Sequence, residues 1–254
     1  MVLTPTFIPN FNLSLDWYMT HMTNAITNIS GQGVDQQNLC IASAPAYNSP
    51  FCGLYVRPIA PGGAGYTSAA NYPTEVWSSP TNAAIQQMEG WDLEANYRFA
   101  LDDIVSGWGG DIALRNLASY QPVNFSRTLT TAFPTWAFAP KFRQSTFFSY
   151  TNGGFTLALQ NQFLSSTKKA TSATNQNYKI SSLGSNDLLD VTVSEGFDLW
   201  GASNEIYLNV SNIANTRAPL YTAGTAGLPG LFYPTAGFHD DMGRYFTLGI
   251  KGRF

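Results

Sequence analysis

Apolar and polar residues alternate with a period of two through most of this chain, and this pattern restricts it to a β-rich fold. Near the start, Phe11, Leu13 and Leu15 fall on one side of an extended chain, whereas Asn12 and Ser14 fall on the other. The pattern recurs to the end of the sequence and predicts eight strands, at residues 10–20, 90–100, 111–120, 142–150, 155–163, 189–199, 205–211 and 245–254. Most of these segments have about 9–11 residues, the length that a tilted strand needs to cross a bilayer.

The connections between the predicted strands fall into two classes. Short links are predicted at residues 101–110, 151–154 and 201–204, and Gly153-Gly154 is typical of a tight hairpin. Long polar segments rich in Gly and Pro cover residues 22–89, 121–141, 164–187 and 212–244. Loops of this length are unusual inside a compact soluble domain. Outer-membrane barrels, in contrast, combine short turns at one end with long loops at the other.

Composition excludes two classes of protein. The chain has 13 Lys and Arg against 16 Asp and Glu, and only 11% of its residues are charged, whereas about 25% is usual in a soluble domain. So few cations, scattered along an acidic chain, make no basic surface, and we expect no nucleic-acid partner. The chain also contains no run of about 18 apolar residues, so we expect no transmembrane helix.

The alternation itself allows two arrangements. A soluble β-sandwich would turn its apolar residues inward, whereas a membrane barrel turns them to the lipid. We favour the barrel, because the polar side carries few Lys and because aromatic residues such as Trp17, Trp91 and Tyr150 lie at strand ends, where an interfacial girdle would be. The predicted fold class is an all-β, antiparallel, up-and-down transmembrane β-barrel fragment of about eight strands, with short periplasmic turns and long extracellular loops.

Charged residues on the polar side are the first candidates for a functional site. In a barrel they would face the lumen, and the set comprises Asp92, Glu94, Arg98, Arg115 and Arg143. Opposite charges on adjacent strands would form a ladder. Such a ladder would either guide a polar solute or only stabilise the sheet.

The two cysteines, Cys40 and Cys52, are separated by eleven residues, in a stretch rich in Gly, Ser, Pro and Ala. An oxidising compartment would join them in a disulfide, whereas the cytosol would leave two inert thiols. Neither histidine is close in sequence and no CxxC motif occurs, so we expect no metal and no cofactor. A hydrolase or acyltransferase using His239 would need a serine nucleophile, but no GxSxG motif is present, and we predict no enzymatic activity.

Several segments resemble one family, the TonB-dependent outer-membrane receptors, over nearly the whole chain. The resemblance to the C-terminal half of the receptor barrel is carried by residues 11–18 (FNLSLDWY), 24–26 (NAI), 90–97 (GWDLEANY), 208–213 (LNVSNI) and 243–254 (GRYFTLGIKGRF). It implies that residues 1–254 are the C-terminal part of such a barrel, with the signal peptide, TonB box and plug domain absent. The implied function is a segment of a receptor for TonB-energised uptake of a scarce solute, of the siderophore, cobalamin or carbohydrate class.

The resemblance also implies a location and partners. The chain would lie in the outer membrane of a Gram-negative bacterium, in contact with lipid and with the barrel-assembly machinery, and would meet TonB only through the missing plug. Its small-molecule ligand is not specified. Cys40 and Cys52 would staple the first external loop, and the last strand would carry the assembly signal, at Phe246, Leu248, Ile250 and Phe254.

Such a fragment is not expected to transport a solute alone. The alternative is a self-contained eight-stranded outer-membrane barrel with a structural or adhesion role. That alternative requires hydrogen bonds between residues 10–20 and 245–254, which would close the sheet on itself.

Overall fold

A computed structural model describes residues 1–128, 135–136, 139–168, 182–199, 201–222, 232–234 and 242–253. The chain divides into two compact units. The first, called the sheet unit below, comprises Met1–Tyr18, Glu89–Pro122 and Phe138–Phe254. The second, called the loop unit, comprises Met19–Met88 and Val123–Ala137.

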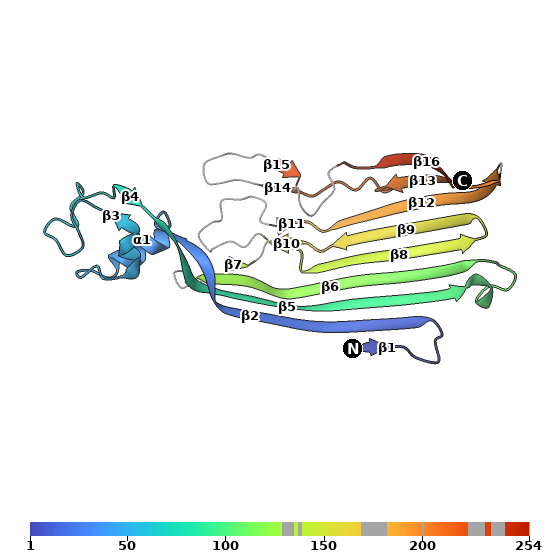
Figure 1. Cartoon of the computed structure of the whole chain (residues 1–254), viewed down its shortest axis with the longest axis horizontal. Helices are drawn as coiled ribbons and strands as arrows, with labels where there is room; N and C mark the ends of the chain where they lie inside the picture. Colours follow the sequence, from blue (N-terminus) through green and yellow to red (C-terminus); the bar gives the residue numbers. More distant parts are fainter. Residues whose placement is uncertain are drawn as a thin grey trace. The chain divides into compact units, whose positions relative to one another are not determined.

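The dominant element is an antiparallel, up-and-down sheet, with strands in the order β1-β2-β5-β6-β8-β9-β12-β13-β16 and β7 paired to β6 (Figure 1). Their bounds are β1 Val2–Leu3, β2 Phe11–Ser30, β5 Ser78–Ala100, β6 Asp111–Thr128, β7 Thr135–Trp136, β8 Phe142–Asn152, β9 Phe155–Leu164, β12 Asn186–Leu199, β13 Ala202–Ser211 and β16 Tyr245–Arg253. Each of the eight predicted segments corresponds to one of these strands. The predicted all-β, up-and-down architecture is therefore confirmed.

Three strands are much longer than predicted. β2 has 20 residues, β5 has 23 and β6 has 18, so the expectation of about 9–11 residues is wrong for them. All three continue from the sheet unit into the loop unit. Their added parts contain Pro80, Pro122 and Asn24, the last with a φ of 55°. Such residues normally argue against a strand interior, which explains why the pattern ended early.

Short elements occupy the connections. Between β2 and β5 lie α1 (Val34–Ile41), η1 (Pro50–Leu54) and the paired strands β3 (Tyr55–Val56) and β4 (Glu75–Val76). The other connections contain η2 (Leu101–Asp103), the pair β10 (Thr167–Lys168) and β11 (Ser182–Leu183), and the pair β14 (Leu220–Thr222) and β15 (Phe232–Pro234). The loops predicted at residues 22–89 and 121–141 therefore include residues that belong to β2, β5 and β6 in the structure. No helix of the described part is long and apolar enough to cross a membrane.

One short turn lies where the sequence predicts it, whereas another is displaced from its predicted position. β8 and β9 are joined by Gly153-Gly154, as predicted, and Gly153 has a φ of 58°, in the left-handed region that favours glycine. The turn predicted at residues 201–204 lies earlier, since Ala202 already belongs to β13.

The register aligns residues of like polarity across six strands. One apolar row consists of Ile112, Tyr150, Leu157, Val193, Leu208 and Leu248. A second consists of Leu114, Phe148, Leu159, Val191, Val210 and Phe246. The row between them, on the opposite face, is Ala113, Ser149, Ala158, Thr192, Asn209 and Thr247. The sheet therefore has one apolar and one polar face.

The ladder is open among the described strands. β1 pairs there with β2 alone, and β16 pairs with β13 alone. No hydrogen-bonded pairing joins β2 to β16 in the part of the chain that the structure describes. The bonds that a closed eight-stranded barrel requires are therefore not observed.

The loop unit has a small core of its own. Ile29 and Leu54 are buried against each other, and Phe51 and Tyr55 pack around them. A disulfide joins Cys40 at the end of α1 to Cys52 in η1, and both cysteines are buried. The pair that the sequence offered for a loop-stapling disulfide is thus bonded in the structure.

Candidate functional site

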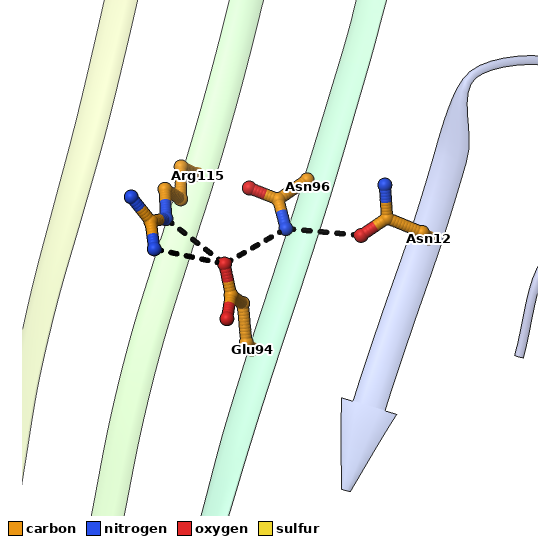
Figure 2. A network of polar contacts seen from close by, with 4 residues as sticks. All are labelled: Asn12, Glu94, Asn96 and Arg115. Atoms are coloured by element: carbon orange, nitrogen blue, oxygen red, sulfur yellow. Dashed lines mark hydrogen bonds and ion pairs between the residues drawn. The ribbon is translucent and has the colours of Figure 1, made fainter. Parts of the chain in front are cut away.

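The polar face of the sheet carries a hydrogen-bonded network across three strands (Figure 2). Glu94 of β5 accepts a hydrogen bond from Nε of Arg115 on β6 at 3.0 Å and forms an ion pair with its Nη2, also at 3.0 Å. The same Glu94 oxygen accepts from Asn96 Nδ2 at 3.1 Å. Asn96 Nδ2 also donates to Oδ1 of Asn12 on β2, at 3.0 Å. The network therefore connects β2, β5 and β6 through side chains.

This network is open to solvent. The side chain of Arg115 is 52% exposed and that of Glu94 is 37% exposed. Ion pairs in such positions are screened by water and contribute little to stability. Their polar atoms remain free to exchange partners with a solute, so the network can bind as well as support the sheet.

A hollow of about 610 Å³ lies over the polar face beside this network. It is lined from seven strands, by residues that include Asn12, Arg98, Arg115, Gln160, Asp190, Thr192 and Asn209. A flat sheet could not bring Asn12 of β2 and Asn209 of β13 to one hollow, because five strands separate them in the sheet order. The polar face is therefore concave in this region.

The five charged residues predicted to face one wet surface do lie over this face, but in two places. Arg98 and Arg115 line the large hollow, whereas Asp92, Glu94 and Arg143 line a neighbouring hollow of about 320 Å³. Within this set, Glu94 and Arg115 form an ion pair across β5 and β6. The pair is one contact of the kind that the predicted ladder of opposite charges requires.

Further polar contacts extend the same face toward β16. Asn209 donates to Thr192 Oγ1 at 2.8 Å across β13 and β12. Glu205 and Lys251 form an ion pair at 3.6 Å, and the Lys251 ammonium lies 4.7 Å from the ring centre of Tyr207. Polar side chains of this face thus form hydrogen bonds or ion pairs both at the β2 end of the sheet and at the β16 end.

Sequence reasoning missed the amides of the network. Alternation places both Asn12 and Asn96 on the polar side of their strands, but the predicted candidates comprise charged residues alone. The two are 84 positions apart, and no local pattern gives the register between their strands. One sequence feature could have identified Asn96: it is two positions from Glu94, so both side chains lie on the same face of the strand.

The apolar face is uncovered in the described residues. Of its two apolar rows, only Val210 is buried. On β16, Phe246 is 66% exposed, Leu248 73% and Ile250 69%. These are the described members of the predicted assembly signal, and their cross-strand partners are Val210, Leu208 and Ile206; Phe254 lies outside the described residues. A soluble sandwich would bury such rows beneath a second sheet.

Aromatic side chains on this apolar face gather at two levels along the strands. Near the short links, the ring pairs are Phe11–Tyr97 at 6.1 Å, Tyr97–Phe99 at 4.9 Å and Tyr150–Phe155 at 6.2 Å. At the second level, they are Trp17–Trp91 at 6.3 Å, within β2 and β5, and Phe142–Phe163 at 6.1 Å, at the other ends of β8 and β9. The two belts are six to eight residue steps apart, about 20–27 Å along a strand. An apolar band of about 25 Å between aromatic girdles is typical of outer-membrane barrels.

A small polar cluster interrupts the apolar face. Asn116 donates to Thr146 Oγ1 at 2.8 Å, and Gln144 donates to the same oxygen at 3.2 Å. Because these groups bond one another, a surrounding apolar medium would cost them less than it would cost unpaired amides.

No group of three or more His, Cys, Asp or Glu side chains that could hold a metal ion occurs among the described residues. His239, the base that a hydrolase would need, lies outside them. Comparison of the chain with protein-family models and with curated protein sequences finds no match.

Proposed function

We propose that this chain is a segment of an outer-membrane β-barrel of the TonB-dependent receptor class. In this proposal the sheet forms part of the barrel wall, with its apolar face against lipid and its concave polar face toward a wet lumen. Uptake of a scarce solute would be the function of the whole receptor, to which this segment contributes wall and lumen surface. The family resemblance of the sequence supplies the class.

The observation that carries the proposal is the exposed apolar face between two aromatic belts. Rows of Leu, Val, Ile and Phe across six strands would be costly in water, at about 25 cal/mol for each Å² of apolar surface. In lipid the same surface is favourable. The aromatic rings would then lie at the two interfaces, where their amphipathic character is best satisfied.

The concave polar face fits the other half of the proposal. Amide, hydroxyl and charged groups of seven strands line one hollow, and such groups can exchange hydrogen bonds with water or with a hydrated solute. Polar interiors of this kind are usual in outer-membrane barrels.

Spin labels on two adjacent residues of β9 test which face meets lipid. The variants Leu157→Cys and Ala158→Cys are each labelled with a nitroxide in the full chain reconstituted in liposomes; the native cysteines are bonded to each other and do not react. We expect the Leu157 label to be accessible to oxygen, which partitions into lipid, and the Ala158 label to be accessible to a water-soluble nickel complex. Equal aqueous access at both positions, or a Leu157 label shielded from both reagents, would contradict the proposal.

A further inference from the structure

The loop unit contains a pocket of about 710 Å³ that the sheet does not contribute to. Ligand pockets in proteins usually measure about 300–1,000 Å³. The walls include Gln37 and Ile41 from α1, Tyr55 and Arg57 from the segment after η1, and Tyr66. The Cys40–Cys52 disulfide joins α1 to η1 beside it, so the wall is held together covalently.

The wall includes three tyrosine rings and one guanidinium. The rings of Tyr47 and Tyr66 lie 4.5 Å apart, and the Arg57 guanidinium lies 5.6 Å from the ring centre of Tyr66. Arg57 Nη1 also donates to the backbone oxygen of Asn71. Arg57 is thus fixed in place by a ring and a carbonyl.

Asn71 gives this segment its shape. Its side chain is 2% exposed and accepts a hydrogen bond from the Ile59 amide at 2.8 Å. It donates to the backbone oxygens of Ile59 and Tyr66, at 3.1 and 2.9 Å. The segment that holds both Arg57 and Tyr66 is therefore arranged before any ligand arrives.

The charge of Arg57 has no counterpart nearby. It is the only Lys or Arg in residues 19–88, and the acidic residues of that range are Asp35 and Glu75. Neither forms an ion pair with Arg57 in the described structure, and the Glu75 carboxylate accepts a hydrogen bond from the Trp77 indole at 3.0 Å. Guanidinium groups match the two oxygens of a carboxylate in geometry and charge.

Two buried polar atoms of the wall lack partners within the described structure. They are the hydroxyl of Tyr55 and Nε of Arg57. An unsatisfied buried polar group costs free energy of folding, and in a native protein it calls for an explanation, such as an ordered water or ion or a functional role.

We propose that this pocket binds a small ring compound that carries a carboxylate, with the carboxylate on the Arg57 guanidinium and the flat face of the ring against Tyr47 and Tyr55. The amide of Gln37 and the hydroxyls of Thr67 and Ser68, which also line the pocket, provide hydrogen bonds for ring hydroxyls. An acidic sugar and a hydroxylated aromatic acid share this chemistry. The site goes beyond the proposed function, because it involves no residue of the sheet unit.

The test measures binding of four probes to the full chain in detergent micelles, by saturation-transfer NMR and calorimetry. The two acids are glucuronate and 4-hydroxybenzoate, and their neutral counterparts are glucose and 4-hydroxybenzamide. We expect at least one acid to bind at least tenfold more tightly than its counterpart. Tighter binding of glucuronate alone assigns an acidic sugar, and of 4-hydroxybenzoate alone an aromatic acid. If neither acid exceeds its neutral counterpart, the proposal is overturned.

Variants locate the binding. Arg57→Gln should weaken binding of the preferred acid at least tenfold, whereas Lys251→Gln, which removes a positive charge from the sheet unit, should leave it unchanged. Equal affinity in Arg57→Gln and the parent chain would refute the site. The comparison of acid with neutral probe needs no variant, so the proposal stays testable if Arg57→Gln does not fold. Arg57 belongs to the loop unit, whereas Leu157 and Ala158 of β9 belong to the sheet unit, so failure here leaves the lipid-facing test of β9 unaffected.

Discussion

Placing a positive charge on Leu159 offers a sharp test of the apolar face. Leu159 lies on β9, midway between Phe155 and Phe163, which belong to the two aromatic belts. Its cross-strand partners are Phe148 and Val191. If this face meets lipid, Leu159 lies near the middle of the bilayer.

The expected cost of Leu159→Arg follows from that depth. An arginine on the lipid face of a barrel costs about 2–4 kcal/mol at the midplane, which is roughly a 30- to 900-fold change in the unfolding equilibrium constant. On a face exposed to water, a surface substitution would usually change stability by only about 0.5 kcal/mol. The two environments therefore predict clearly different results.

The matched control is Gln160→Arg, which adds the same side chain one residue away on the polar face, at the lining of the large hollow. Both variants are refolded in phosphatidylcholine liposomes and unfolded in urea, with tryptophan fluorescence as the signal. We expect a loss of about 2–4 kcal/mol for Leu159→Arg and of about 0.5 kcal/mol or less for Gln160→Arg. Similar losses for the two variants, or a larger loss for Gln160→Arg, would refute the orientation.

Further expectations concern the loop unit, a turn and the polar network. Reduction of the disulfide, whose cysteines are 12 positions apart, should destabilise the loop unit by about 3 kcal/mol through chain entropy, and hydrogen exchange should rise in residues 31–76 but not in β8 and β9. Gly153→Val should cost about 1–2 kcal/mol because of the left-handed φ, and Gly153→Asn less, as measured by urea unfolding. A double-mutant cycle with Glu94→Gln and Arg115→Gln should show coupling at low salt that disappears in 1 M salt, where the Debye length is about 3 Å; coupling that persists would show that the pair is not screened. Burial raises the pKa of Tyr55 above its ordinary value of 10.0, while the nearby Arg57 lowers this pKa in part. The stability that the protonated Tyr55 contributes is therefore present below pH 10 and is lost as the pH rises through the folded-state pKa. Thermal unfolding measured against pH should show a smaller alkaline loss of stability in Tyr55→Phe than in the parent chain.

The sequence predicts the sheet well because its faces are chemically distinct. Each of the eight alternating segments is a strand, since a one-residue slip would exchange every side chain between the two faces. The alternation of apolar and polar residues does not predict a strand where the segment is mostly polar or contains proline. The second half of β2 and the first half of β5 are rich in Asn, Thr, Ser and Gln, and Pro80 and Pro122 are residues that normally end a strand.

The polar site could be predicted only in part, and for a physical reason. Alternation shows which residues share a face, so Glu94 and Arg115 could be placed together. It does not show how far β2 is shifted along β5, and the contact of Asn12 with Asn96 depends on that shift. The pocket around Arg57 was not predicted at all, because it is built from loop contacts without periodicity.

The outer edge of β16 has a consequence for insertion. Along Tyr245–Arg253, every second backbone N–H and C=O points away from β13, where the described structure offers no neighbouring strand. Water would hydrate these groups, but hydrocarbon would leave each of them unsatisfied at a cost of several kcal/mol. If the sheet resides in a bilayer, the unit that inserts is therefore larger than the sheet itself: it includes whichever backbone completes the amide ladder beside β16.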